Sequence, residues 1–262
     1  MWKRTLRLAT LTCGLATAFS ATGAEGHYEE AFYKAGLLNE NGVGIDRDVV
    51  AEVQKRTGFH FTSSEKPRAR IWGELKSGAL DMSVSGIETA ERDRFAWFIP
   101  YLVQRNMAVL RKEKAPLYRS LDEFVADPKA RVGMVRGFVH GDKYDRALSI
   151  LHQQGRVYEA PTIDMIFSLL KAENRIDVVF ALPVFYQRKL AESRMADKVT
   201  ILDWDREGEP IRHCLVLSKK RVAENDREAI QRTVAEMKAD GTLRAIFARY
   251  LSGAELEASL NF

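Results

Sequence analysis

The chain has 262 residues, 46% of them hydrophobic and 29% charged, a composition typical of a globular protein with one large domain or two modest ones. The formal net charge is only +4, and no block of lysine and arginine with interleaved aromatic residues indicates nucleic-acid binding. The five histidines lack the spacing of a metal site, so we expect neither a metal nor a cofactor.

The first 24 residues differ from the rest of the chain. Three basic side chains are followed by an uncharged apolar run from Leu8 to Phe19 and by small residues up to Ala24. This layout is typical of a secretory signal peptide (residues 1–24), and the apolar run is too short to span a bilayer. Its removal would leave 37 basic and 36 acidic residues, a formal charge of +1, and Cys214 as the single cysteine. We therefore expect an exported mature chain without an intrachain disulfide.

The next part of the chain alternates helices with strands. The apolar spacing of Ile45, Val49, Val50 and Val53 predicts a helix that ends before Gly58. Further along, the pattern predicts a helix at 70–76 and strands at 59–61, 80–85 and 106–111. Short apolar strands between helices favour a largely parallel sheet covered on both faces.

The order then restarts, which predicts a second α/β unit. The pattern predicts helices from Ser120 and at 144–154 and 162–171, strands at 130–135, 176–180, 199–202 and 213–217, and a long amphipathic helical region at the end. We expect residues 25–112 plus 213–262 to form a first lobe, and residues 113–212 to form the hinge segments and a second lobe. The chain would then cross twice between the lobes, near 112–117 and 205–212, and a cleft between lobes is a preferred ligand site.

The stretch from Gly78 to Tyr101 carries the strongest chemical signal. A strand ends at Ser85-Gly86, and Thr89 is placed to cap a helical turn that contains Arg92. Exposed N–H groups at a strand end, together with a bidentate guanidinium, form a receptor for a carboxylate. The alternative is that Arg92 pairs on the surface with one of the neighbouring acids, Glu91, Asp93 or Asp122.

This stretch resembles the family 3 periplasmic solute-binding proteins, the receptors of polar amino-acid ABC importers. The resemblance starts from Gly78-Ala79-Leu80-Asp81, Gly86, Thr89 and Glu91-Arg92, and it continues in Gly44-Ile45-Asp46, Phe98-x-Pro100-Tyr101, Ser120-Leu121-Asp122, Val132-Gly133-x-Val135-x-Gly137 and Asn174-Arg175-Ile176-Asp177. It covers roughly residues 42–251.

The resemblance implies a particular fold and set of partners. The fold would be the two-lobed α/β periplasmic binding protein fold, in which each lobe is a mostly parallel sheet flanked by helices and two strands form the hinge. The protein would be a periplasmic monomer that clamps a small-molecule ligand and delivers it to an ABC permease in the inner membrane.

The resemblance also implies where the ligand binds. Arg92 would hold the ligand's carboxylate, and the end of the preceding strand, with the Ser85 hydroxyl, would assist it. The second lobe would contribute the N–H groups of Gly137 and Phe138, and an aromatic near the mature N-terminus would pack on the ligand. Further candidates are the side chains of Phe32, Tyr33, Arg70 (facing the cleft before Trp72), Arg136, His140 and Phe180.

Two positions depart from the family's pattern. Ile87 stands where a serine or threonine is frequent, so one hydroxyl contact is missing. Leu182 stands where amino-acid binders often carry an acid that pairs with the ligand's ammonium group. Because a buried ammonium without an anion costs several kcal/mol, either another acid replaces it or the ligand is not an α-amino acid. The other acids that we consider are Asp164, Asp203 and Asp205.

Two further function classes remain as alternatives. Periplasmic cyclohexadienyl dehydratases resemble the same family, but that chemistry needs a general acid, and residues 180–184 include no carboxylate. Cys214 and His213 are adjacent in a strand, so their side chains point to opposite faces and cannot form a nucleophile–base pair. We therefore expect no enzyme. The other alternative is a sensing receptor, in which the closed clamp is presented to a membrane sensor.

Overall fold

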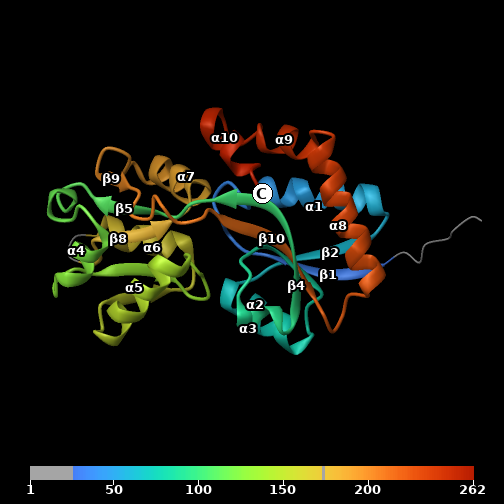
Figure 1. The fold of residues 1–262 in the computed structure, drawn as a ribbon, viewed down its shortest axis with the longest axis horizontal. Coiled ribbons are helices and arrows are strands. Elements are labelled where there is room, and N and C mark those ends of the chain that lie inside the picture. The colour runs from blue at the N-terminus through green and yellow to red at the C-terminus, as the bar shows by residue number, and fades with distance from the viewer. Residues whose placement is uncertain (1–25, 173–174) are drawn as a thin grey trace, which may run out of the picture.

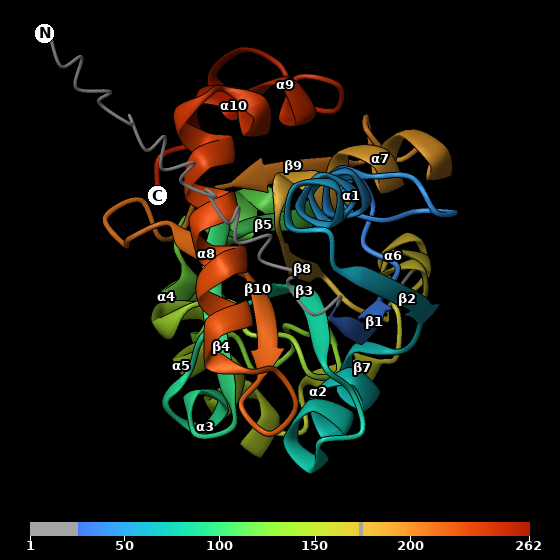
Figure 2. The same ribbon diagram turned by 90° about the vertical axis from the view of Figure 1, so that its right-hand side faces the viewer.

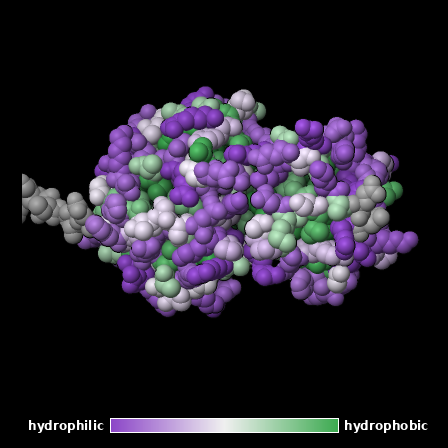
Figure 3. Space-filling view, turned by 180° about the vertical axis from the view of Figure 1, so that it is seen from behind, coloured by the Kyte–Doolittle hydropathy of each residue, from purple (hydrophilic) through white to green (hydrophobic). Residues whose placement is uncertain are grey.

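The computed structural model describes residues 26–172 and 175–262, which form two lobes joined by two crossing segments (Figure 1). The predicted signal peptide, residues 1–24, lies outside the described residues. Among the residues that are described, no helix is long and apolar enough to cross a membrane. Viewed from behind, the surface is mostly hydrophilic and has a waist between the lobes (Figure 3).

The first lobe contains a five-stranded sheet in which three parallel strands come first. The spatial order is β2 (His60–Glu65), β1 (His27–Phe32), β3 (Met82–Gly86), β10 (Ile211–Ser218), β4 (Ala96–Gln104). Strand β1 pairs in parallel with β2 and β3, while β10 lies antiparallel between β3 and β4. A strand from the C-terminal part of the chain therefore completes the sheet that the N-terminal part begins.

The second lobe repeats this plan. Its spatial order is β7 (Val157–Ala160), β6 (Val132–Val135), β8 (Val178–Ala181), β5 (Met107–Arg111), β9 (Val199–Leu202). Strand β6 pairs in parallel with β7 and β8, and β5 lies antiparallel between β8 and β9. In each sheet, the strand that follows a crossing between the lobes is the fourth in spatial order. The expected two-lobed α/β fold is confirmed.

The structure corrects the expected end of the first segment of lobe 1. We placed that end at residue 112, but β5 (Met107–Arg111) pairs only with strands of the second sheet. The first crossing is therefore made by Arg105 and Asn106, between β4 and β5. An apolar run such as Met107–Leu110 is equally suited to the interior of either sheet, so its sequence does not say which sheet it joins.

Helices flank both sheets. Those of the first lobe are α1 (Ile45–Thr57), α2 (Arg68–Ser77), α3 (Ala90–Asp93), α8 (Glu224–Ala239), α9 (Thr242–Phe247) and α10 (Gly253–Ser259). Helices α1, α8 and α9 pack together, and α8 also contacts β4 as it runs along the first sheet (Figure 2). The second lobe has the 3₁₀ helix η1 (Ala115–Leu117) and helices α4 (Leu121–Ala126), α5 (Asp142–Gln153), α6 (Ile163–Lys171) and α7 (Pro183–Ser193).

The predicted pattern of α1 is confirmed, and β4 shows what the pattern missed. The four apolar residues of α1 named above are buried, and Gly58 ends the helix in the left-handed conformation with φ 74°. Strand β4 was not predicted, and it contains Pro100, which lacks an N–H group. Because β4 is the outermost strand of its sheet, the missing N–H of Pro100 does not interrupt hydrogen bonding in the interior of the sheet.

Candidate functional site

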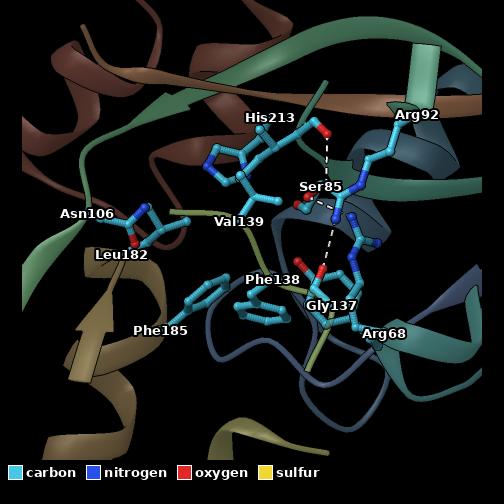
Figure 4. Close-up of a pocket in the computed structure, with 12 residues that line it drawn as sticks. Arg68, Ser85, Arg92, Asn106, Gly137, Phe138, Val139, Leu182, Phe185 and His213 are labelled. Atoms are coloured by element: carbon cyan, nitrogen blue, oxygen red, sulfur yellow. Dashed lines mark hydrogen bonds between the residues drawn. The ribbon is translucent and has the colours of Figure 1, made fainter. Parts of the chain in front are cut away.

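A cavity lies between the two lobes, beyond the carboxyl end of β3 (Figure 4). Its first-lobe lining is Tyr33, Arg68, Ser85, Ile87, Arg92 and His213, its second-lobe lining is Gly137, Phe138, Val139, Leu182 and Phe185, and Asn106 comes from the crossing segment. The free volume between these side chains is about 20 Å³, which is room for about one water molecule. The lobes are therefore nearly in contact around this site.

Arg92 joins the two lobes at the centre of the site. Its Nη1 donates to the carbonyl of Ile87 at 2.9 Å, and its Nη2 donates to the carbonyl of Gly137 in the second lobe at 3.0 Å. Its guanidinium lies over the ring of Trp72, 3.8 Å from the centroid. Burial, and then the charge of Arg68, lower the pKa of Arg92 to about 10. This arginine lies in an environment that favours an anion.

The local structure explains how Arg92 reaches this position. Thr89 precedes the short helix α3, and its hydroxyl accepts a hydrogen bond from the backbone N–H of Arg92 at 3.3 Å. The neighbouring acids turn outward, where Glu91 pairs with Lys76 and Asp93 pairs with Lys219, each at 3.0 Å. Arg92 makes no ion pair with a carboxylate among the described residues, which argues against the surface-pair alternative.

Arg68 is a second arginine of the cavity, and sequence reasoning missed it. Its side chain is buried, and its guanidinium donates to the carbonyls of Val84 at 3.0 Å and Ser85 at 3.1 Å. Burial lowers its pKa. A signal was present in the sequence, because Arg68 shares the helical spacing i, i+3, i+4, i+7 with the buried Ile71, Trp72 and Leu75.

Arg70, which we expected to face the cleft, does not line the cavity. Its side chain is exposed and donates from Nε to Glu74, one helical turn later, at 2.7 Å. Two residues of an α-helix are separated by about 200° around the axis, so Arg68 and Arg70 point to nearly opposite sides. Arg68, and not Arg70, therefore lines the cavity.

Ser85 lines the cavity, but its hydroxyl is engaged elsewhere. The hydroxyl lies 2.9 Å from both carboxylate oxygens of Asp46 and donates to that carboxylate, which also accepts from Tyr101 at 2.5 Å. Ser85 has a left-handed backbone conformation with φ 49°. Burial raises the pKa of Asp46 to about 7. The expected donation from the Ser85 hydroxyl to a ligand is therefore corrected, and Gly86 beside it lies buried at the end of β3.

The second lobe offers aromatic surface and a carbonyl group. Gly137 has φ 85°, and a Cβ atom there would lie 3.2 Å from the backbone of Ala69 in the other lobe, so this close approach requires glycine. The ring of Phe138 meets Tyr33 edge to face, with centroids 5.7 Å apart. The N–H of Phe138 already donates to the carbonyl of Val135 at 3.1 Å, which corrects its expected role as a free donor.

Several other candidates lie outside the cavity. Arg136 is exposed and lies 3.3 Å from Glu159. Phe180 belongs to the core of the second lobe, 4.4 Å from Tyr144 between ring centroids, and His140 is buried next to it. Phe32 does not line the cavity either. The same holds for the three acids that we considered as partners of an ammonium group, which are Asp164, Asp203 and Asp205.

His213 and Asn106 are polar residues of the cavity that the sequence did not reveal. His213 is 2% exposed, and neither of its ring nitrogens has a hydrogen-bond partner among the described residues. Burial lowers its pKa to about 4, so the imidazole is neutral at pH 7. Asn106 donates to the carbonyl of His140 at 3.1 Å. Cys214, next in the strand, is buried, and burial raises its pKa to about 12.

The arrangement is that of a two-lobed protein whose α/β lobes meet over a small cavity lined by two arginines. No group of three or more histidine, cysteine, aspartate or glutamate side chains in the described part of the chain could hold a metal ion. The family model of bacterial extracellular solute-binding proteins, family 3, matches residues 24–253. The chain therefore belongs to this family.

Solved structures agree in fold. An ancestral arginine-binding protein bound to arginine is 22% identical, with a TM-score of 0.70 over 87% of this chain and 99% of that one. A substrate-binding protein of an ABC uptake transporter from Streptococcus pneumoniae, with bound histidine, is 15% identical, with a TM-score of 0.71 over 86% and 92%.

A histidine kinase sensor domain with similarity to periplasmic binding proteins is 15% identical, with a TM-score of 0.70 over 86% and 96%. No curated protein sequence matches this chain. The family and these neighbours are binding proteins, and at such identities the structural likeness shows the fold alone.

Proposed function

We propose that this protein is the periplasmic substrate-binding component of an ABC importer. It closes two lobes over a small anionic or zwitterionic solute, a polar amino acid or a related carboxylate, and presents the closed form to an inner-membrane permease. The family supports the clamp, and the basic start and apolar run of residues 1–24 support export. The lobes rotate about the crossing segments at Arg105–Asn106 and between β9 and β10.

The observation that carries the proposal is the position of Arg92. An arginine has five N–H donors, and Arg92 uses two of them, one on a first-lobe carbonyl and one on a second-lobe carbonyl. A ligand carboxylate between the lobes would replace the Gly137 carbonyl with a charged acceptor. The lobes would then be joined through the ligand, and closure would depend on it.

A sensing role is the second candidate, because a sensor domain shares this fold. Both roles use the same clamp and differ in what recognises the closed form. A dehydratase-like activity has less support, because the residues that line the cavity include no carboxylate to act as a general acid.

The proposal is tested by thermal unfolding and titration calorimetry of the mature chain with a panel of solutes. The panel contains L-amino acids, dicarboxylates, aromatic acids including prephenate, quaternary ammonium compounds and short sugars. A ligand at a hundred times its dissociation constant adds about 2.7 kcal/mol of stability. We expect the shift to be confined to compounds that carry a carboxylate.

Arg92→Ala is the decisive variant. We expect it to weaken the binding of the best carboxylate by about 2–5 kcal/mol, because Arg92 forms the charged contact. Arg70→Ala is the matched control, since it removes an arginine of α2 that lies outside the cavity and should leave binding unchanged. Equal affinities of Arg92→Ala and the unchanged protein would refute the proposed site, and conversion of prephenate would establish the enzyme alternative.

A further inference from the structure

Resting on the proposed function, we propose that the ligand is a carboxylate without an ammonium group, such as a 2-oxo or 2-hydroxy acid with an apolar or aromatic body. Arg92 and Arg68 hold its anionic end, and His213 binds the oxygen next to the carboxylate.

The first step is the charge of the cavity lining. Two guanidinium groups face it, and none of the twelve residues that line it is acidic. Arg92 and Arg68 share one aromatic neighbour, the ring of Trp72, whose centroid is 3.8 Å from the first and 4.5 Å from the second guanidinium carbon. Two cations so close repel each other, and an anion between the lobes relieves that repulsion, whereas an ammonium group would add to it.

The second step is that the nearest buried acid is already engaged. Asp46 is fully buried, lies behind Ser85, and does not line the cavity. Its carboxylate accepts hydrogen bonds from the hydroxyls of Ser85 and Tyr101, so its oxygens are held away from the ligand. Asp164 lies at a neighbouring opening and pairs with Lys189 at 2.7 Å. The lining of the cavity therefore offers an ammonium group no carboxylate partner.

The third step is the state of His213. Both ring nitrogens are buried, and neither has a hydrogen bond of normal geometry among the described residues, although the backbone of Ser85 is close enough to act on the pKa of the ring. The ring lies at the cavity beside Asn106 and Val139 (Figure 4). A neutral imidazole has one donor and one acceptor nitrogen, which suits a hydroxyl or a carbonyl group. Because a buried polar group without a partner is costly, a ligand oxygen that satisfies His213 gains affinity.

The fourth step is the apolar part of the lining. Phe138 lies between Tyr33 and Phe185, with ring centroids 5.7 Å and 5.6 Å away. Leu182 and Ile87 complete a mainly apolar surface, in which the hydroxyl of Tyr33 is the polar side-chain group. This lining matches a ligand body that is apolar or aromatic.

The test is calorimetry with two matched series that differ only at the atom next to the carboxylate. The first contains L-phenylalanine, phenylpyruvate, L-3-phenyllactate and 3-phenylpropanoate. The second contains L-leucine, 4-methyl-2-oxopentanoate, 2-hydroxy-4-methylpentanoate and 4-methylpentanoate. We expect the oxo or hydroxy acid of at least one series to bind more than about 30-fold more tightly than its amino acid, since the ammonium group is left without an anion.

Two variants assign the roles. His213→Phe should reduce the affinity for the oxo or hydroxy acid about tenfold and leave that for the unsubstituted acid nearly unchanged, because only the former has an oxygen to bind. His213→Gln, which keeps a donor and an acceptor, should restore part of the loss. Leu182→Asp, which places a carboxylate on the second-lobe wall, should shift the preference toward the amino acid. Arg70→Ala should change none of these ratios.

The outcomes separate this inference from the proposed function. If an amino acid binds as tightly as its oxo and hydroxy analogues, or if the broader panel yields only amino-acid ligands, the inference is wrong and the importer proposal stands. If no carboxylate of either panel binds, or if Arg92→Ala leaves the affinity unchanged, the inference and the importer proposal are both wrong. A loss with His213→Phe that is equal for all members of a series would contradict the role of His213.

Discussion

Two cations join the lobes of this protein, and their surroundings differ. Arg92 reaches from the first lobe to the Gly137 carbonyl and has no carboxylate partner. Lys189, on α7 of the second lobe, lies 3.0 Å from Glu40 of the first lobe, 2.7 Å from Asp164 and 3.1 Å from Glu192. Although burial lowers the pKa of Lys189, its hydrogen bonds to these three carboxylates hold that pKa above its usual value.

The difference separates a structural contact from a binding contact. The charge of Lys189 is offset by the protein itself, so this junction is complete without a ligand. Arg92 makes no ion pair among the described residues, and Asp145 and Glu91 act on its charge only from a distance. Its two hydrogen bonds occupy two of the five N–H groups of a guanidinium. Under the proposed function, a junction of the first kind stabilises closure without a ligand, whereas one of the second kind would be strengthened by a bound anion.

Another buried cation, Arg156, sharpens the comparison and should give the largest effect on stability. It lies wholly within the second lobe and donates to the carbonyls of Phe124, Val125, Asp127 and Ala130. Arg156→Met removes the side-chain donor from these four carbonyls, of which that of Asp127 keeps a backbone partner, the N–H of Ala130 at 3.1 Å. The variant should lower the free energy of unfolding by about 3–5 kcal/mol in chemical denaturation. Ligand affinity should not change, and a loss of affinity above threefold would contradict the distinction. Arg131→Met, at an exposed arginine, is the control.

Lys189→Met tests the junction between the lobes at Lys189, whose charge is offset by carboxylates of the protein. It leaves Glu40 buried without a cation when the lobes are closed, so it should weaken ligand binding by about 2–3 kcal/mol in calorimetry. The double variant with Glu40→Gln should recover most of this loss. If Lys189→Met lowers stability and leaves affinity unchanged, Lys189 acts only within the second lobe.

Glu30 tests how a buried acidic side chain without a cationic partner affects stability. It is fully buried in β1, its Oε2 accepts from Ser63 at 3.2 Å, and its Oε1 has no partner in the part of the chain that the structure describes. Burial raises its pKa to about 8, so the folded protein holds a proton that the unfolded chain releases near its ordinary pKa of 4.5. This contribution to stability is complete below about pH 4.5 and is lost as the pH rises through 8.

Denaturation at pH 5 and pH 8.5 measures this loss. We expect Glu30→Gln to reduce the difference in unfolding free energy between the two pH values by on the order of 2 kcal/mol. An unchanged difference would show that Glu30 does not carry the proton.

The smallest effect is expected at the exposed pair of Arg70 and Glu74. Arg70→Ala removes a hydrogen bond of 2.7 Å between side chains one helical turn apart. Such pairs contribute about 0.3–0.5 kcal/mol, so unfolding should change by no more than this and ligand affinity not at all. A larger loss of affinity would show that Arg70 contributes to the binding site.

The sequence by itself determined the class of fold, and it pointed to Arg92 as the centre of the proposed site. The apolar spacing of α1 and the strand-to-arginine motif ending at Arg92 are local patterns, and residues close in the chain suffice to read them. The resemblance carried by that motif is confirmed by the family match over residues 24–253.

The tertiary structure alone decided which groups face the cavity. Whether β5 joins the first or the second sheet depends on pairing with β8 and β9, which lie far along the chain. The Ser85 hydroxyl turns to Asp46 because that carboxylate, 39 residues away in sequence, is buried beside it. His213 and Asn106 line the same cavity only because β10 returns from the second lobe to the first. Hydrogen bonding and burial between distant segments set these choices, and a local pattern does not contain them.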